Sequence, residues 1–354
     1  ISRFLDDPQG GDFLALAQAA LAFQVERIEP IRDLCKRRGI EPTNLRDWRQ
    51  IPLVPVAAFQ SLRLAAAEPL EVFRSSGTTG GERSTHYHPF PDLYRRSVDA
   101  SFPKSCLPTP APVPMLSLIG ARELLPDSSL AFMIAHVLAR WGSPGSRTAF
   151  TRRGVETAQA RSWLGAQQRA GQPVLILATA FALVDLLDAL VRIDLRFRLP
   201  AGSALFETGG FKGRTREIER PELLALITER LGVPPERVVR EYGMTELTSQ
   251  CYTRALAGGD PELFVPPHWL RARALDPITL EEQPAGWSGV LAILDLANLG
   301  SALHVLTEDL GIVDGEGFRL LGRAAGAELR GCSLVAEELA TGTLAAPVPR
   351  AAPD

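Results

Sequence analysis

The feature that most restricts the fold is an alternation of short apolar runs and helical patterns in the middle of the chain. Residues 174–178 are apolar almost throughout, as in a parallel strand that is covered on both faces. Helical spacing follows over 181–193, and strands at 204–207 and 238–242 enclose a helix at 222–231. This β-α-β alternation predicts an α/β fold with a doubly wound, mainly parallel sheet and flanking helices.

Other elements are expected on either side of this alternation. Residues 12–39 have helical spacing, with Asp12 as a cap and Pro30 as the point where the helix breaks or a second one begins. A helix capped by Ser129 is expected to run to residue 140. The proline-rich stretch 104–114 is expected to be a loop.

The character of the sequence changes near residue 260, where turns become frequent and helices scarce. Short strands are expected at 287–296, 302–307, 311–313 and 318–321, with a hairpin turn at 314–317. We therefore predict a small β-rich subdomain against the α/β body. The expected parts are a helical segment 1–72, an α/β body 73–258, the β-rich subdomain 259–340 and a poorly ordered Ala/Pro/Gly-rich tail 341–354.

Composition excludes several classes of function. The net charge is −3 and Lys and Arg are scattered, so there is no electrostatic case for nucleic acid or an anionic membrane. The cysteines at 35, 106, 251 and 332 are far apart and indicate neither a zinc site nor a disulfide framework, which suits a reducing compartment. No signal segment and no apolar run of about 18 residues is present, so we expect a cytoplasmic protein without a membrane span.

Residues 75–81 place four hydroxyl side chains and three glycines in succession. Glycines let a ligand approach the backbone closely, and hydroxyl and N–H groups donate to phosphate oxygens. No Gly-Lys-Ser/Thr sequence closes the stretch, so it is not a Walker A loop. The residues alone fit either a phosphate-binding loop or a solvated turn.

Three further motifs follow this loop in a fixed order: Tyr242-Gly243-Met244-Thr245-Glu246, Thr307-Glu308-Asp309 before Gly311, and Gly322-Arg323. Together the four resemble the adenylate-forming (ANL) enzymes, such as acyl-CoA synthetases and luciferases. The flanking segments 52–59, 207–214 and 330–334 are similar to the acyl-protein synthetase (LuxE-like) branch, which includes the ligase of bacterial bioluminescence fatty acid reductase. The resemblance covers about residues 13–339 and implies an ANL-type N-terminal domain.

The resemblance also implies a site for ATP. Tyr242 would stack on adenine, Asp309 would accept hydrogen bonds from the ribose hydroxyls, and Arg323 would contact ribose or mark a hinge. The loop would bind the β- and γ-phosphates, with Arg83 near the position of the usual lysine. The implied nucleotide-binding residues are Ser75, Ser76, Gly77, Thr78, Thr79, Gly80, Arg83, Gly209, Gly210, Tyr242, Gly243, Asp309 and Arg323.

For catalysis, the resemblance implies that Thr245 contacts the α-phosphate and that Glu246 binds Mg²⁺, a cation that prefers carboxylate and phosphate oxygens. Relatives carry a C-terminal domain with a catalytic lysine after the hinge, whereas no lysine follows Arg323 here. We therefore expect that domain to be absent from this sequence, either because the chain was cut or because this branch adenylates without that lysine. Lys212 is a weak candidate to take the place of that catalytic lysine. Cys332 is the candidate for covalent acyl transfer, against the alternative of a buried structural thiol.

Residues 84–89 read as a short strand that places His86 and His88 on one face. A metal pair is one interpretation, although no third ligand is apparent nearby. A surface hairpin or a contact to substrate is the preferred one. Cys35, Cys106 and Cys251 are read as structural, although Cys251 could line an acyl pocket.

The leading hypothesis is an AMP-forming carboxylate ligase that uses ATP and Mg²⁺ to make an acyl-adenylate. The acyl group would then pass to an enzyme or carrier-protein thiol or to an amine, so an acyl-accepting protein is an expected partner. The alternatives are an acyl-CoA synthetase similar to phenylacetate-CoA ligases and a non-catalytic nucleotide-binding partner in a complex. The acid could be a fatty, aryl or amino acid.

Overall fold

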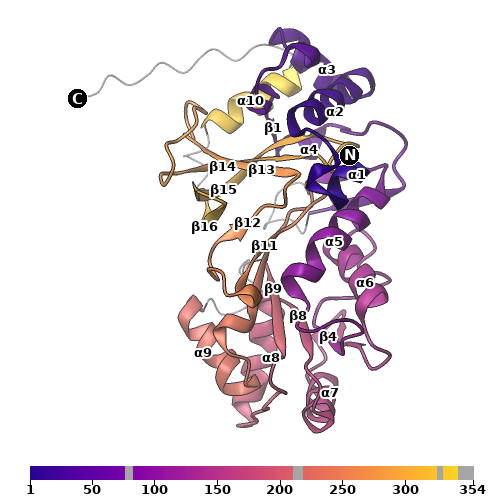
Figure 1. The fold of residues 1–354 in the computed structure, drawn as a ribbon, viewed down its shortest axis with the longest axis vertical. Helices are drawn as coiled ribbons and strands as arrows, with labels where there is room; N and C mark the ends of the chain where they lie inside the picture. Colours follow the sequence, from indigo (N-terminus) through magenta and orange to yellow (C-terminus); the bar gives the residue numbers. More distant parts are fainter. Residues whose placement is uncertain (76–82, 210–217, 325–329, 342–354) are drawn as a thin grey trace, which may run out of the picture. The chain divides into compact units, whose positions relative to one another are not determined.

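The computed structural model describes residues 1–75, 83–209, 218–324 and 330–341 of the chain (Figure 1). These residues form two compact units that interleave along the sequence. The first unit contains residues 1–97, 244–250 and those described from 265 onward, and the second contains Val98–Gly243 and Cys251–Phe264. The four consecutive parts expected from the sequence stay a prediction, and the tail 342–354 lies outside the described residues.

In the second unit, a mixed sheet runs in the order β11–β10–β9–β8–β4–β5. The neighbouring strands are parallel except for β11, which is antiparallel to β10. The predicted doubly wound, mainly parallel sheet is therefore confirmed, with β11 as its antiparallel strand. The strand bounds are β4 Met115–Ser117, β5 Arg147–Thr148, β8 Leu175–Thr179, β9 Ala204–Thr208, β10 Val238–Tyr242 and β11 Cys251–Thr253, and a separate hairpin joins β6 Phe150–Thr151 to β7 Gly154–Val155.

Helices cover both faces of this sheet, with α8 and α9 on one side and α5 and α6 on the other (Figure 1). Ile176 and Leu205 pack with Leu187 and Ile227 in the core beneath α8 and α9. On the opposite face, Phe102 of α5 lies 6.0 Å from Phe206 of β9, ring centre to ring centre. The helix bounds are α5 Pro91–Cys106, α6 Ser129–Trp141, α7 Thr157–Ala170, α8 Ala180–Arg192 and α9 Arg220–Leu231, with short 3₁₀ turns at Pro235–Arg237 and Ala255–Ala257.

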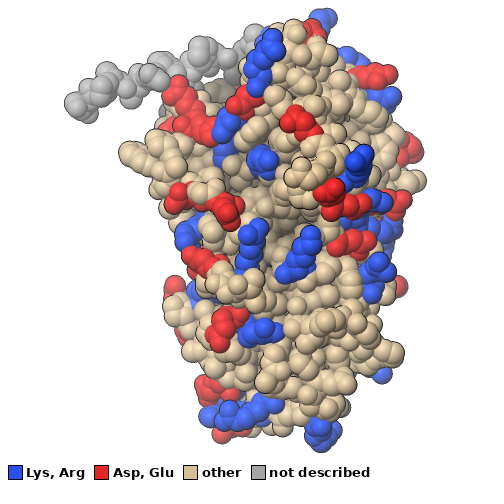
Figure 2. Space-filling view, viewed as in Figure 1, with Lys and Arg blue, Asp and Glu red and all other residues tan. Residues whose placement is uncertain are grey.

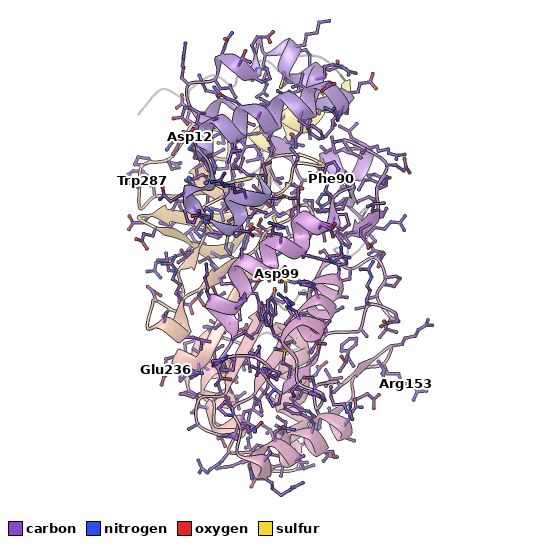
Figure 3. The ribbon with its side chains drawn as sticks, turned by 45° about the vertical axis from the view of Figure 1, so that its right-hand side comes forward. Asp12, Phe90, Asp99, Arg153, Glu236 and Trp287 are labelled. Atoms are coloured by element: carbon purple, nitrogen blue, oxygen red, sulfur yellow. The ribbon has the colours of Figure 1, made fainter. Side chains whose placement is uncertain are left out.

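Two sequence-based predictions in this unit were wrong at their boundaries. Residues 104–106 belong to α5 rather than to a loop, because Pro103 is accommodated inside the helix. The cap of α6 is Ser128, whose hydroxyl accepts a hydrogen bond from the Ala131 N–H at 3.2 Å, and Ser129 is already helical. Asp99 on α5 pairs with His136 of α6 at 2.8 Å and links the two helices (Figure 3).

In the first unit, β13 Leu270–Leu275, β14 Ser288–Asp295, β15 His304–Asp314 and β16 Gly317–Arg323 form an antiparallel sheet, and β1 Val54–Pro55 pairs with β15 in parallel. The strands expected at 302–307 and 311–313 are one continuous strand, β15. Its register shifts between Leu310 and Gly311. A Cβ at Gly311 would lie 2.7 Å from the Arg319 carbonyl oxygen, so this position needs glycine. The predicted hairpin turn joins β15 to β16, with Gly315 at φ +57°.

The helices of this unit follow the predicted pattern. Asp12 caps α2 by accepting a hydrogen bond from the Ala15 N–H at 2.8 Å, and Pro30 stands in the first turn of α3. The Arg38 guanidinium, at the end of α3, forms two hydrogen bonds with the carboxylate of Glu338 on α10, at 2.6 and 3.2 Å. The remaining bounds are α1 Ser2–Asp6, α2 Phe13–Arg27, α3 Glu29–Arg37, α4 Ala58–Ser61, α10 Arg330–Thr341, β2 Glu71–Arg74 and β3 Thr85–His88, with 3₁₀ turns at Pro8–Gly10, Pro42–Asn44 and Trp48–Gln50 and the short strand β12 at Phe264–Val265.

The surface carries basic and acidic side chains interspersed on the face shown in Figure 2. Trp287, just before the first residue of β14, has 64% of its surface exposed (Figure 3). Among the helices that the structure describes, none has the length and apolar character needed to cross a bilayer.

Candidate active site

The motif 242–246 begins in the second unit and ends in the first. Tyr242 closes β10 and is 6% exposed, with its ring centre 6.0 Å from that of Phe264. Gly209 follows the neighbouring strand β9 at φ +73°, a backbone conformation that favours glycine. Ligands of doubly wound sheets bind beyond the carboxyl ends of the strands, and both residues lie at such ends. Gly210 and Lys212 lie outside the described residues, and Gly243 is exposed.

In the first unit, Glu246 is the central acidic group. Its side chain is buried, with 5% of the residue exposed. Burial raises the pKa of the Glu246 carboxyl, and a hydrogen bond with the Ser84 side chain and the charge of Arg323 act in the opposite direction. Ser84 is the residue at which the described chain leaves the predicted phosphate loop, so the Glu246 carboxylate lies against the exit of that loop.

Asp309 and Arg323 face each other across the β15–β16 hairpin. The Arg323 Nε lies 3.6 Å from the Asp309 Oδ1, and one of its terminal nitrogens lies 4.0 Å from the Glu308 Oε2. Asp309 has 14% of its side chain exposed and Arg323 has 57%. The structure therefore brings two of the predicted ribose-binding residues together and places the Arg323 charge near Glu246.

The predicted phosphate loop can be described only at its two ends. The Ser75 N–H donates to the Ser84 carbonyl at 3.0 Å, and the Ser84 N–H donates to the Ser75 hydroxyl oxygen at 3.0 Å. The Arg83 guanidinium donates to the carbonyls of Ser75 and Arg74. Arg83 thus fastens the base of the loop here. The loop residues Ser76, Gly77, Thr78, Thr79 and Gly80 lie outside the described part of the chain.

A buried acid that the sequence analysis missed holds the segment after Glu246. The Asp295 carboxylate, at the end of β14, accepts hydrogen bonds from the N–H groups of Thr248 at 3.1 Å, Ser249 at 2.8 Å and Ala297 at 3.0 Å. The Ser249 hydroxyl also donates to it at 2.8 Å. Burial raises the pKa of Asp295, and these hydrogen bonds oppose the shift. The sequence signal that could have identified Asp295 is an acidic residue at the end of an apolar strand.

His86 and His88 are buried, at 1% and 3% exposure, so the expectation of a surface hairpin was wrong. They stand on β3 of the β2–β3 hairpin and face inward. The His86 Nδ1 lies 2.7 Å from the Thr245 carbonyl oxygen, and the His88 Nε2 lies 2.9 Å from the Thr248 hydroxyl. Burial lowers the pKa of His86 to about 4 and that of His88 well below its ordinary value. The described residues contain no group of three or more His, Cys, Asp or Glu side chains that could hold a metal ion.

The structure describes the side chains of three cysteines and not that of Cys332. Cys35, Cys106 and Cys251 are buried, and their thiols are not in disulfides. Burial raises the pKa of Cys35 to about 11 and that of Cys106 well above its ordinary value, which disfavours the thiolate. Cys332 lies in the first turn of α10, and its side chain is outside the described residues.

Comparisons with known proteins bear on the family and the fold. A family model described as acyl-protein synthetase, LuxE, matches residues 159–341, more than half of the chain. A long-chain-fatty-acid–luciferin-component ligase of Vibrio harveyi is 29% identical over 134 residues, 36% of this chain. That match spans 34% of the ligase, about a third of its length.

Solved structures with a similar fold include 2-hydroxyisobutyryl-CoA ligase in complex with 2-HIB-AMP and CoA. It has a TM-score of 0.67 at 14% identity and covers 88% of this chain and 69% of its own. ATP-bound MatB from Rhodopseudomonas palustris has a TM-score of 0.51 at 17% identity and covers 73% of this chain and 48% of its own. At these identities the likeness concerns the fold, and it confirms the predicted adenylate-forming fold class.

Proposed function

The chain belongs to the acyl-protein synthetase (LuxE) family, and we propose that it activates a carboxylic acid with ATP and transfers the acyl group to a thiol or amine acceptor. The observation that carries this proposal is the arrangement around Glu246 in the first unit. The buried carboxylate interacts with Ser84 at the loop exit and with Arg323, and Arg323 lies beside Asp309. Parts of three motifs widely separated in the sequence thus meet at one acidic group.

In the proposed first step, a carboxylate oxygen of the acid attacks the α-phosphorus of ATP. The bond between that phosphorus and the bridging oxygen breaks, and pyrophosphate leaves with the electron pair. The product is an acyl-adenylate, and no protein covalent bond is needed. Positioning and charge stabilisation supply the acceleration in such a reaction. We assign Tyr242 to adenine, Asp309 to the ribose hydroxyls, Arg323 to ribose, and Thr245 to the α-phosphate.

The donor chemistry near Glu246 suits Mg²⁺. The ion prefers carboxylate and phosphate oxygens, and Glu246 offers a buried carboxylate whose desolvation a cation would relieve. We therefore assign Glu246 as the protein ligand. When bound, the ion would neutralise charge on the phosphates. The Ser84 side chain orients the Glu246 carboxylate for this role.

In the proposed second step, an acceptor thiolate or amine attacks the acyl carbon, and AMP leaves with the oxygen that came from the acid. Cys332 is our candidate for an enzyme thiol acceptor. The first turn of a helix is a position that favours thiolate over thiol in general, and α10 begins at Arg330. Cys35 and Cys106 have raised pKa values and are poor alternatives. Lys212 is kept as a weaker candidate for charge stabilisation.

ATP–pyrophosphate exchange across a panel of fatty, aryl and amino acids tests the first step. We expect exchange with one class of acid, lowered about 100-fold or more in Glu246→Gln and retained in Cys332→Ala. Glu26→Gln, whose side chain is 70% exposed, is the matched control for loss of a carboxylate. Absence of exchange with every acid, despite measurable ATP binding, would favour a non-catalytic nucleotide-binding role.

Incubation with radiolabelled acid tests the second step. We expect ATP-dependent label on the wild-type protein that resists denaturation and is released by hydroxylamine, and no such label on Cys332→Ala. AMP release that requires CoA, with an unlabelled protein, would favour an acyl-CoA synthetase.

A further inference from the structure

We propose that His86, His88, Thr248 and Asn298 form a directed hydrogen-bond network in which the two histidines are neutral opposite tautomers, and that this network positions Thr245 and Glu246 for adenylation. The positioning role rests on the proposed function. The tautomers do not, because they follow from the hydrogen bonds alone. All four side chains belong to the first unit.

The direction of the network starts at Asn298, in the loop after β14. Its Nδ2 lies 2.9 Å from the Glu246 carbonyl oxygen and 2.7 Å from the Ala302 carbonyl oxygen. Carbonyl oxygens only accept, so both N–H groups of the amide are used and its orientation is fixed. The Asn298 Oδ1 must then be an acceptor. It lies 2.9 Å from the Thr248 hydroxyl, which therefore donates its single proton to Asn298.

The tautomer of His88 follows from the state of Thr248. Once the Thr248 hydroxyl has given its proton to Asn298, it can only accept at its second contact. That contact is the His88 Nε2 at 2.9 Å. His88 must therefore carry its proton on Nε2. A neutral His88 then has an unprotonated Nδ1, and that atom is buried without a hydrogen-bond partner among the described residues.

His86 has the opposite tautomer for a simpler reason. Its Nδ1 lies 2.7 Å from the Thr245 carbonyl oxygen, which only accepts, so the ring must carry its proton on Nδ1. The His86 Nε2 is buried and also lacks a hydrogen-bond partner among the residues that the structure describes. Leaving these two nitrogens as lone pairs avoids two buried N–H groups without acceptors.

Neutral rings also fit the surroundings of the pair. The ring centres of His86 and His88 are 5.0 Å apart, so two charged imidazoles would repel each other. Phe59 lies edge-on to His86, and Phe73 lies beside His88, with ring centres 5.8 and 5.9 Å away. Burial lowers the pKa of His86 to about 4, and the Asn298 side chain acts in the opposite direction without outweighing burial.

The consequence for the site is that two consecutive carbonyls of the motif are each held by one side-chain donor. His86 holds the Thr245 carbonyl, and Asn298 holds the Glu246 carbonyl. Fixing both peptide groups fixes the directions in which the two side chains leave the backbone. His86 stands on β3, the strand that follows the predicted phosphate loop, so the network ties this strand to the motif. These are positioning residues, because none is assigned a contact to a reacting atom.

Imidazole nitrogen NMR tests the tautomers directly in the full chain labelled with ¹⁵N-histidine. Long-range ¹H–¹⁵N correlation spectra at pH 7 distinguish Nδ1–H, Nε2–H and charged rings. The chain has five histidines, and His86→Asn and His88→Gln assign the two signals by their loss. We expect His86 as Nδ1–H and His88 as Nε2–H. The same tautomer at both positions, or a charged ring at either, would overturn the network whether or not the protein adenylates an acid.

Paired substitutions test the positioning role. An Asn amide nitrogen occupies roughly the place of imidazole Nδ1, and a Gln amide nitrogen that of Nε2. We expect His86→Asn and His88→Gln to keep kcat for pyrophosphate exchange within about threefold. In the single variants His86→Gln and His88→Asn the amide nitrogen is at the wrong ring position. We expect each of them to lower kcat about 10- to 100-fold, because displacing a catalytic group by about 1 Å has effects of that size.

The urea unfolding midpoint, measured for the same four variants, separates positioning from stability. The proposal requires kcat to be higher in the variants whose amide nitrogen replaces the donor nitrogen of the histidine, whatever their urea unfolding midpoints. Equal kcat in matched and mismatched variants would overturn the positioning role. If the wild-type protein shows no exchange with any acid, the proposed function fails, and the NMR result still decides the network.

Discussion

Replacing Glu241 by Gln should remove a pH dependence from the stability of the second unit. Glu241 is buried in the sheet on β10, and the Thr208 hydroxyl of β9 donates a hydrogen bond to its carboxylate. Burial raises the pKa of Glu241 from 4.5 to about 7, against the smaller opposite effect of Thr208. Gln has the same shape as the protonated side chain and its carbonyl oxygen can still accept from Thr208.

The magnitude follows from the difference between the folded and unfolded pKa. The shift from 4.5 to about 7, at about 1.4 kcal/mol for each pH unit, corresponds to about 3 kcal/mol. The folded protein holds the proton more tightly than the unfolded chain. The contribution of Glu241 to the free energy of unfolding is therefore fully present below pH 4.5, falls as the pH rises, and is lost above pH 7.

Urea unfolding followed by circular dichroism at pH 5, 6, 7 and 8 measures this effect. We expect the free energy of unfolding of Glu241→Gln, minus that of the wild-type protein, to rise by about 2–3 kcal/mol from pH 5 to pH 8. Glu236→Gln, at an exposed position in the same unit (Figure 3), controls for the loss of one carboxyl. Parallel pH profiles for wild type and Glu241→Gln would refute the reasoning.

Three further substitutions test individual contacts within one unit or the other. Asp295→Ala leaves three backbone N–H groups without their acceptor and should lower the free energy of unfolding by about 3 kcal/mol or more, measured by urea titration. A loss below about 1 kcal/mol would contradict the role of Asp295 in holding the segment after Glu246. Phe206→Ala removes a ring packed against Phe102 and should cost about 3–5 kcal/mol in the same assay, whereas an unchanged midpoint would rule out a packed aromatic core on this face. Arg38→Ala leaves the buried Glu338 without its bidentate partner and should speed hydrogen exchange in α10, while the exposed Arg32→Ala should not; equal exchange in both variants would be inconsistent with that contact.

The strands of the α/β body were predictable because their signal is local. The apolar runs at 174–178, 204–207 and 238–242 each became a strand, and the helical spacing between them became α8 and α9. By contrast, α5 was not predicted, and its last residues, 104–106, were assigned to the proline-rich loop expected at 104–114. Tertiary packing of Phe102 against Phe206 and Trp141 overrides that local preference.

The candidate site also contains some residues that could be predicted from local sequence and others that could not. Glu246, Asp309 and Arg323 could be named from short motifs, and the structure brings their side chains into one region of the first unit. The groups that hold this region could not be named, because His86 and Thr245 are 159 residues apart and meet only in the folded chain. The roles assigned to the loop 76–80, Gly210, Lys212 and the Cys332 side chain stay predictions, since these lie outside what the structure describes.

The most direct test of acid activation follows the oxygen atom of the substrate. The acid that supports exchange is supplied with both carboxylate oxygens as ¹⁸O, and AMP is recovered after one turnover in the presence of hydroxylamine. Attack of the carboxylate on the α-phosphorus predicts AMP with one ¹⁸O atom, because AMP leaves the acyl carbon with the bridging oxygen. AMP without ¹⁸O would contradict an acyl-adenylate and with it the function proposed for this chain.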